Sequence, residues 1–191
     1  MTLLRRVALD SGRLDVVVNA AGVMSKGRPS TYGDKNGQGI EGLVEMTDVN
    51  LLAPIYIMVE ATGIMSRNGG GTVINITSAK YLFPDLYHIQ YQMGKMGLSR
   101  VTMGVAKNFM KEYNVRIVDV QPGNTKTNID KGVWTEGNDK AETFVVQNIS
   151  DWWRRTFGND PKEVADVIYK IAEGGIRGTT IPVGLDARIG R

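Results

Sequence analysis

Apolar runs and helical stripes alternate along this chain. Short runs rich in valine, isoleucine and threonine predict buried strands at residues 15–19, 72–77, 115–120 and 179–183. Apolar residues at helical spacing predict helices at about 2–11, 41–66, 88–112 and 161–173. We expect a Gly-rich loop at 24–40 and a long irregular stretch to about 158, with a short helix near 141–156. Such alternation predicts an α/β fold with a parallel sheet of about four strands.

The predicted helix at 88–112 carries an unusual inward face. At about 100° per residue, one stripe contains Tyr91, Lys95, Leu98, Thr102, Val105 and Phe109, whereas Arg100, Lys107 and Lys111 fall on the opposite side. The lysine therefore lies among the apolar, inward residues. A buried ammonium is costly unless it has a partner or a function.

The last predicted helix has clear start and stop signals. Asp160 is placed to cap it, Pro161 suits its first turn and Glu163 suits its third position. The inward face consists of Val164, Val167, Ile168 and Ile171. Gly174 and Gly175 end the pattern.

Ser78 and the Tyr91/Lys95 pair indicate proton-transfer chemistry. Ser78 ends a predicted strand, and Tyr91 follows thirteen residues later, with Lys95 one turn further on. An ammonium about 4 Å from a phenol, at an effective dielectric of about 20, contributes about 4 kcal/mol, or about 3 pKa units. We therefore expect the lysine to lower the pKa of the tyrosine, so that the phenol can exchange a proton with a substrate hydroxyl or carbonyl.

Other polar or small-residue turns follow the predicted strands in the same way. Asn19–Gly22 follows the first strand, and Pro122–Thr127 follows the third. Ligands of open α/β sheets bind at the carboxyl ends of the strands, so we expect these turns and Ser78 to share one edge.

Together these motifs resemble the short-chain dehydrogenase/reductase family. The Ser…Tyr-x-x-x-Lys arrangement matches its active site, Asn19-Ala20-Ala21-Gly22 resembles its Asn-Asn/Ala-Ala-Gly turn, and Pro122-Gly123 with Thr125 and Thr127 resembles its Pro-Gly-x-x-x-Thr segment. Thr125 stands where the family more often has Val or Ile. Asn50, in Asp48-Val-Asn-Leu51, resembles the asparagine of its Asn/Asp-Val-Asn segment.

The resemblance implies an oxidoreductase that passes a hydride between NAD or NADP and a carbonyl or alcohol substrate. Tyr91 would donate or accept the proton, and Lys95 would activate the tyrosine and contact the nicotinamide ribose. Ser78 would form a hydrogen bond with the substrate oxygen. Asn50 would hold a water molecule beside the lysine. The cofactor would lie along Asn19–Gly22 and along Pro122, Gly123, Thr125 and Thr127. It also implies a partial doubly wound, Rossmann-like sheet and a homo-oligomer paired through the helices that contain Asn50 and Tyr91.

The resemblance covers about the C-terminal three-quarters of a family domain. The family's Thr-Gly-x-x-x-Gly-x-Gly phosphate turn has no counterpart here, so residues 1–191 are expected to form one domain that lacks its first strands, and NAD cannot be told from NADP. On its own such a chain should bind dinucleotide poorly and be marginally stable. The alternative is a non-catalytic relative that acts as a partner and binds no cofactor.

Composition excludes several other classes. The chain has 191 residues, a net charge of +3, no cysteine and one histidine, His88, which leaves no basis for disulfides, zinc–thiolate or His-cluster metal sites, or nucleic-acid binding. We find no apolar run approaching eighteen residues, and a cytoplasmic location is expected. Two groups of residues suggest a partly apolar substrate: the methionines Met93, Met96 and Met103, and the aromatic residues Trp134, Phe144, Trp152, Trp153 and Phe157. Methionines are equally common in protein cores, and the aromatic residues could equally cover the sheet.

Overall fold

The computed structural model describes residues 2–24, 38–79, 89–129, 156 and 158–189. Several predictions fall outside these ranges: most of the Gly-rich loop, the short helix near 141–156, His88 and the five aromatic residues of the 134–157 segment.

The sheet of the described residues is parallel, as predicted. Its four strands are β1 (Val16–Asn19), β2 (Gly71–Ile76), β3 (Val115–Pro122) and β4 (Thr180–Val183), in the order β1-β2-β3-β4. The register places Asn19 beside Asn75, and Asn75 beside Asp119. All four carboxyl ends therefore meet at one edge, which confirms the α/β class and the placement of the predicted turns.

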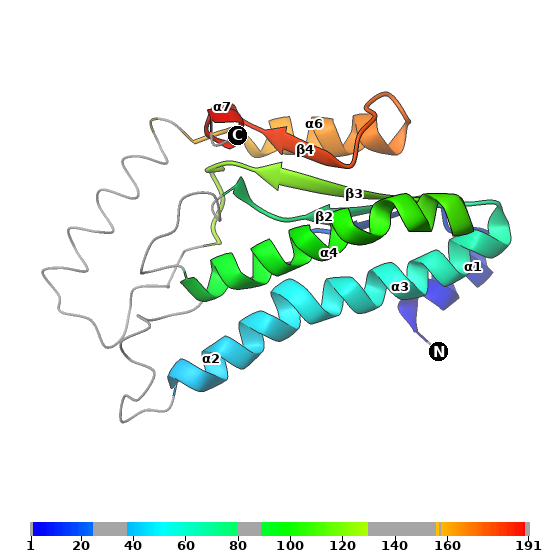
Figure 1. Ribbon diagram of the computed structural model, residues 1–191, viewed down its shortest axis with the longest axis horizontal. Helices are drawn as coiled ribbons and strands as arrows, with labels where there is room; N and C mark the ends of the chain where they lie inside the picture. The colour runs from blue at the N-terminus through cyan, green and yellow to red at the C-terminus, as the bar shows by residue number, and fades with distance from the viewer. Residues whose placement is uncertain (1, 25–37, 80–88, 130–155, 157, 190–191) are drawn as a thin grey trace, which may run out of the picture.

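Helices cover both faces of this sheet (Figure 1). Helices α1 (Leu3–Ser11), α3 (Ala53–Met65) and α4 (Ile89–Tyr113) lie on one side, and α6 (Pro161–Ala172) lies on the other, beside β4. The arrowheads of β3 and β4 point toward the end of the molecule where α2 (Gln38–Thr47) and the first turns of α4 lie.

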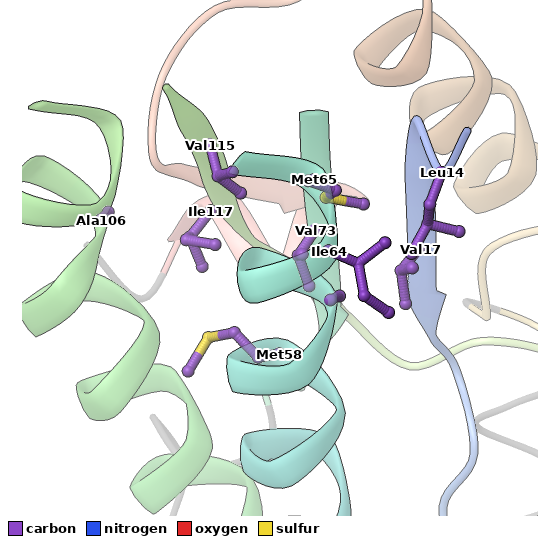
Figure 2. Close-up of a cluster of buried hydrophobic side chains, with 10 residues drawn as sticks. Leu14, Val17, Met58, Ile64, Met65, Val73, Ala106, Val115 and Ile117 are labelled. Carbon is purple, nitrogen blue, oxygen red and sulfur yellow. The ribbon is translucent and has the colours of Figure 1, made fainter. Parts of the chain in front are cut away.

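The core beneath α3 and α4 follows from strand register. Val17, Val73 and Ile117 are neighbours across β1, β2 and β3 and point to the same face. Met58 and Met65 of α3 pack against this row, and all five side chains are buried (Figure 2). Full burial of such a side chain contributes about 1.5–3 kcal/mol, so this layer fixes α3 and α4 on the sheet.

The second core lies beneath α6 and confirms the predicted inward face. Its buried residues are Ile74, Val118, Val120, Ile171 and Val183, with Val164, Val167 and Ile168 packed against them. The Asp160 carboxylate accepts a hydrogen bond from the backbone N–H of Lys162 at 2.8 Å and caps the helix as expected. A short helix, α7 (Leu185–Ile189), follows β4 and was not predicted.

The predicted helix at 41–66 is interrupted in the structure. Its first part, α2, begins at Gln38, and a π-helical turn, η2 (Asp48–Leu52), joins it to α3; the 3₁₀ turn η3 (Ser66–Asn68) follows. The N–H of Ala53 bonds to the Asp48 carbonyl, five residues back. Pro54 has no N–H to offer Asn50, and its ring crowds the carbonyl of that residue, which accounts for the wider turn.

Within the described residues, the stretch Leu43–Asn68 is long and apolar enough, by length and composition, to cross a membrane, which the sequence reasoning did not anticipate. Its Met58, Ala61 and Met65 are buried against the sheet. A helix that packs into a protein core has the same composition, so the stretch is weak evidence for a membrane span.

Candidate active site

The first two turns of α4 present Tyr91 and Lys95 to the sheet edge. Lys95 is only 3% exposed, and its Nζ donates to the carbonyl oxygen of Ile76, the last residue of β2, at 2.8 Å. Burial lowers the pKa of this ammonium to about 8. The predicted inward stripe is confirmed: Leu98 and Thr102 are buried, whereas Lys107 and Lys111 are exposed.

Ser78 meets the tyrosine from the end of β2. It lies two residues beyond the strand, is buried, and forms a side-chain hydrogen bond with Tyr91. Burial raises the pKa of the Tyr91 phenol, and the hydrogen bond with Ser78 acts in the opposite direction without overcoming it. The expected lowering of the tyrosine pKa by Lys95 is therefore wrong: the ammonium is directed at the Ile76 carbonyl, and burial dominates.

Asn50 holds the turn that follows β1. Its Oδ1 accepts from the N–H of Val23 at 3.0 Å, and its Nδ2 donates to the carbonyl of the same residue at 2.8 Å. A Cβ added to Gly22 would lie 3.2 Å from Lys95 Nζ and 3.3 Å from Asn50 Oδ1. Glycine at this position thus lets the backbone pass directly over the lysine and the asparagine.

The remaining residues of the first turn divide into two groups. Asn19 is buried and donates from Nδ2 to Asn75 Oδ1 at 2.7 Å and to the Pro54 carbonyl at 3.2 Å. Its side chain therefore ties β1 to β2 and α3. Ala20 and Ala21 are exposed beyond the strand.

The Pro122–Thr127 turn is fixed by residues that sequence reasoning missed. The Gly123 N–H donates to Val183 at 2.8 Å, and Asp186 accepts from the N–H of Asn124 at 2.6 Å. Asn159 donates to the Asn124 carbonyl at 3.0 Å and to Asp186 at 3.3 Å. No local pattern marks Asn159 or Asp186, because each becomes relevant only when distant segments meet.

The two threonines of this turn lie within its own hydrogen-bond pattern. Thr125 Oγ1 donates to the Gly123 carbonyl at 2.9 Å, and the Thr127 N–H donates to the Thr125 carbonyl at 2.8 Å. Both residues are at the same sheet edge as Ser78, because the turn directly follows β3.

The methionines that suggested an apolar substrate lie on a different side of α4 from Tyr91 and Lys95. Met93, Met96 and Met103 are exposed by 46%, 45% and 42%, on the outer side of α4. They therefore give no evidence about a substrate at the Tyr91 face.

Comparisons with known proteins identify the family and the fold. The family model for short chain dehydrogenases matches residues 1–138. Short chain dehydrogenase ausX of Aspergillus calidoustus is 30% identical over 180 residues, which cover 90% of this chain and 67% of that protein. The uncharacterized oxidoreductase C162.03 of Schizosaccharomyces pombe is 26% identical over 171 residues, 85% of this chain and 55% of the relative.

Solved structures share the fold. A short-chain dehydrogenase from Streptomyces avermitilis superposes with a TM-score of 0.76 at 19% identity, covering 98% of this chain and 67% of its own. The angucycline C-6 ketoreductase LanV, solved with bound NADP, has a TM-score of 0.71 at 23% identity, covering 94% and 65%. The chain spans between about half and two-thirds of the length of these relatives. From the family match and the shared fold, the chain belongs to the short-chain dehydrogenase/reductase family.

Proposed function

We propose that this chain carries the catalytic part of an NAD(P)-dependent oxidoreductase acting on a carbonyl or alcohol. The hydrogen bond between Ser78 and Tyr91, at the carboxyl edge of the sheet and one helical turn from the buried Lys95, is the observation that carries the proposal. A phenol that can donate a proton, with a hydroxyl beside it and an ammonium nearby, can serve as a general acid for a substrate oxygen.

Tyr91 would deliver the proton. A tyrosine phenol holds its proton at neutral pH, so Tyr91 can donate it as the general acid in carbonyl reduction. Burial, which raises the pKa of this phenol, makes proton release harder, and hydrogen bonding to the substrate oxygen would have to offset that cost. Ser78, already within hydrogen-bonding reach of the phenol, would bind the same substrate oxygen and orient it toward Tyr91.

The residues around Lys95 fit a nicotinamide dinucleotide. An ammonium has three N–H donors, and Ile76 is the acceptor of the one hydrogen bond seen for it among the described residues, so donors are left for ribose hydroxyls. Gly22 leaves space for close backbone approach. The dinucleotide, when bound, would supply or accept the hydride. Ala20, Ala21, Gly123, Thr125 and Thr127 line the same edge, and NAD and NADP are equally compatible with them.

Asn50 would have two roles, one for its side chain and one for its backbone carbonyl. Its amide group is engaged with both polar atoms of Val23, so it holds the Gly22 turn against Lys95. Its carbonyl receives no bond from Pro54, which makes it the acceptor we propose for a water beside the lysine.

The pyrophosphate of the cofactor is proposed to need a further segment. β1 lies at an edge of the described sheet, and Val18 is 40% exposed. Adding a strand, a Gly-rich turn and a helix beside β1 is expected to raise both dinucleotide affinity and the melting temperature. We also propose that the protein forms a homo-oligomer and that it works in a reducing compartment such as the cytoplasm.

The substitution Tyr91→Phe tests the function directly. NADH and NADPH are titrated by tryptophan fluorescence against the chain with the added segment, and oxidation of the bound dinucleotide is followed with a panel of ketones and aldehydes. Tyr91→Phe should lower the rate by about 10²–10⁴-fold and leave dinucleotide affinity unchanged, because only the proton-bearing oxygen is removed. Tyr56→Phe, on the exposed side of α3, is the matched control and should keep the full rate.

Two results would contradict the proposal. One is a Tyr91→Phe variant that retains more than about a tenth of the wild-type rate. The other is a chain, with the added segment, that neither binds a dinucleotide nor reduces any carbonyl, which would favour the non-catalytic alternative.

A further inference from the structure

The face of the sheet beneath α3 and α4 carries a polar row next to its apolar one. Val17, Val73 and Ile117 form the apolar row, and two residues further along each strand stand Asn19, Asn75 and Asp119. All three polar side chains are buried. This polar row therefore separates the apolar core from the carboxyl edge.

Asp119 is the only carboxyl group in this row, and it is fully buried. One of its oxygens accepts from the hydroxyl of Thr77, and the other accepts from Ser99 Oγ and from Gln121 Nε2, each at 2.6 Å. Gln121 Nε2 also donates to Ser99 Oγ at 3.2 Å, so two of the donors are linked to each other. Asp119, Thr77, Ser99 and Gln121 are called the Asp119 cluster below. A buried carboxylate is tolerated when donors of this kind surround it.

The three donors come from three separate parts of the candidate site. Thr77 directly precedes Ser78, at the end of β2. Ser99 follows Lys95 by one turn of α4, and Gln121 directly precedes the Pro122–Gly123 turn. One carboxyl group thus joins the serine, the tyrosine–lysine helix and the turn proposed to hold the nicotinamide.

We propose that Asp119 is a positioning residue that fixes these three segments relative to one another. The effect of Asp119 on catalysis rests on the proposed function. Its role in holding the three segments together is argued from the hydrogen bonds alone. Displacements of about 1 Å in such constellations cost about 10²-fold in rate. Loss of the shared acceptor would let each segment shift without the other two.

Two substitutions separate geometry from packing. In Asp119→Asn, the amide can donate to Thr77 Oγ1, whose hydroxyl already lies 3.2 Å from the Val120 carbonyl, while the remaining oxygen accepts from Ser99 and Gln121. This variant should preserve the cluster. Asp119→Val keeps a similar size but removes both acceptors. Ile117→Ala, two residues earlier on the same face, is the control for simple loss of core stability.

The test uses residue-resolved amide hydrogen exchange on the full 191-residue chain and, in parallel, kcat and KM of the same variants in the chain that carries the added strand, turn and helix. Asp119→Val should speed exchange at least tenfold in Thr77–Ala79, Lys95–Ser99 and Gln121–Asn124 together, and lower kcat about 10²-fold at similar KM. Asp119→Asn should restore both readouts. Ile117→Ala should show neither the three-segment pattern nor the selective fall in kcat.

If Asp119→Val does not fold, Thr77→Val judges the proposal by the same exchange readout, since it removes one hydroxyl from β2. Faster exchange at Lys95–Ser99, across the carboxyl group, would support the inference. Exchange changes confined to the substituted strand, or the same pattern in Ile117→Ala, would overturn it. A wild-type chain that is inactive even with the added segment would count against the proposed function, while the exchange pattern would still decide the role of Asp119.

Discussion

Lys95 combines a place in the candidate active site with a cost in stability. Its ammonium is buried, and the pKa falls from 10.5 to about 8. Between these values the unfolded chain binds a proton that the folded chain has released, so the free energy of unfolding rises with pH in this window. Well below pH 8 both states are protonated, and the full cost, about 3 kcal/mol, is present.

We therefore expect Lys95→Met to stabilise the fold at pH 7 while impairing activity. Chemical denaturation at pH 7 and at pH 10 measures the effect, and the advantage of the variant over the wild type should shrink at the higher pH. Lys107→Met, on the exposed side of α4, should show no such pH-dependent difference. A Lys95→Met variant that is less stable at pH 7 would mean that the hydrogen bond to Ile76 outweighs the burial cost.

At the residue level, spacing alone predicts that Ser78, Tyr91 and Lys95 share one edge; the structure shows the hydrogen bond of Ser78 with Tyr91 and the burial of Lys95, and their joint chemical role stays a prediction. The helical period and the strand-end position of the serine carry that information. The direction of the Tyr91 pKa could not be predicted, because it depends on how deeply the phenol is buried. Spacing also could not show that Lys95 donates to a backbone carbonyl.

At the level of elements, the α6 cap gives a clean test. Asp160→Ala removes the acceptor for the Lys162 N–H and should lower the free energy of unfolding by about 1 kcal/mol, as measured by denaturant titration. Asp160→Ser should retain most of the stability. Asp166→Ala, an exposed position inside the same helix, serves as the control; an equal loss there would show that charge, rather than capping, matters.

The helices and strands that are marked by their own sequence pattern could be predicted. Those that depend on steric crowding between residues, or that are too short to show a pattern, could not. The strands and α6 follow from apolar runs and capping residues, so their bounds are close to those expected. The π-helical turn η2 depends on how Pro54 crowds the carbonyl before it, and helical periodicity does not register that crowding. Helix α7 is only five residues long, too short to show a period.

At the scale of the whole molecule, the outer surface of α3 and α4 predicts self-association. Tyr56 and Val59 on α3 and Met103 and Met110 on α4 are large apolar residues that are 42–70% exposed. We expect a homo-oligomer by light scattering, and Val59→Lys with Met103→Lys should convert it to a monomer. Tyr169→Lys, on α6 across the sheet, should leave the assembly unchanged. A wild-type chain that is monomeric at high concentration would contradict this.

The polar row also has a consequence for building chimaeras with relatives. Crossovers within the apolar row replace one aliphatic side chain by another, and the neighbours can adapt. A crossover that imports β3 alone, from a relative with an apolar residue at position 119, would remove the carboxylate acceptor while keeping the hydroxyls of Thr77 and Ser99 that donate to it. Strands β2 and β3 and helix α4 should therefore be exchanged as one block, because the Asp119 hydrogen bonds join them although they are separate in sequence.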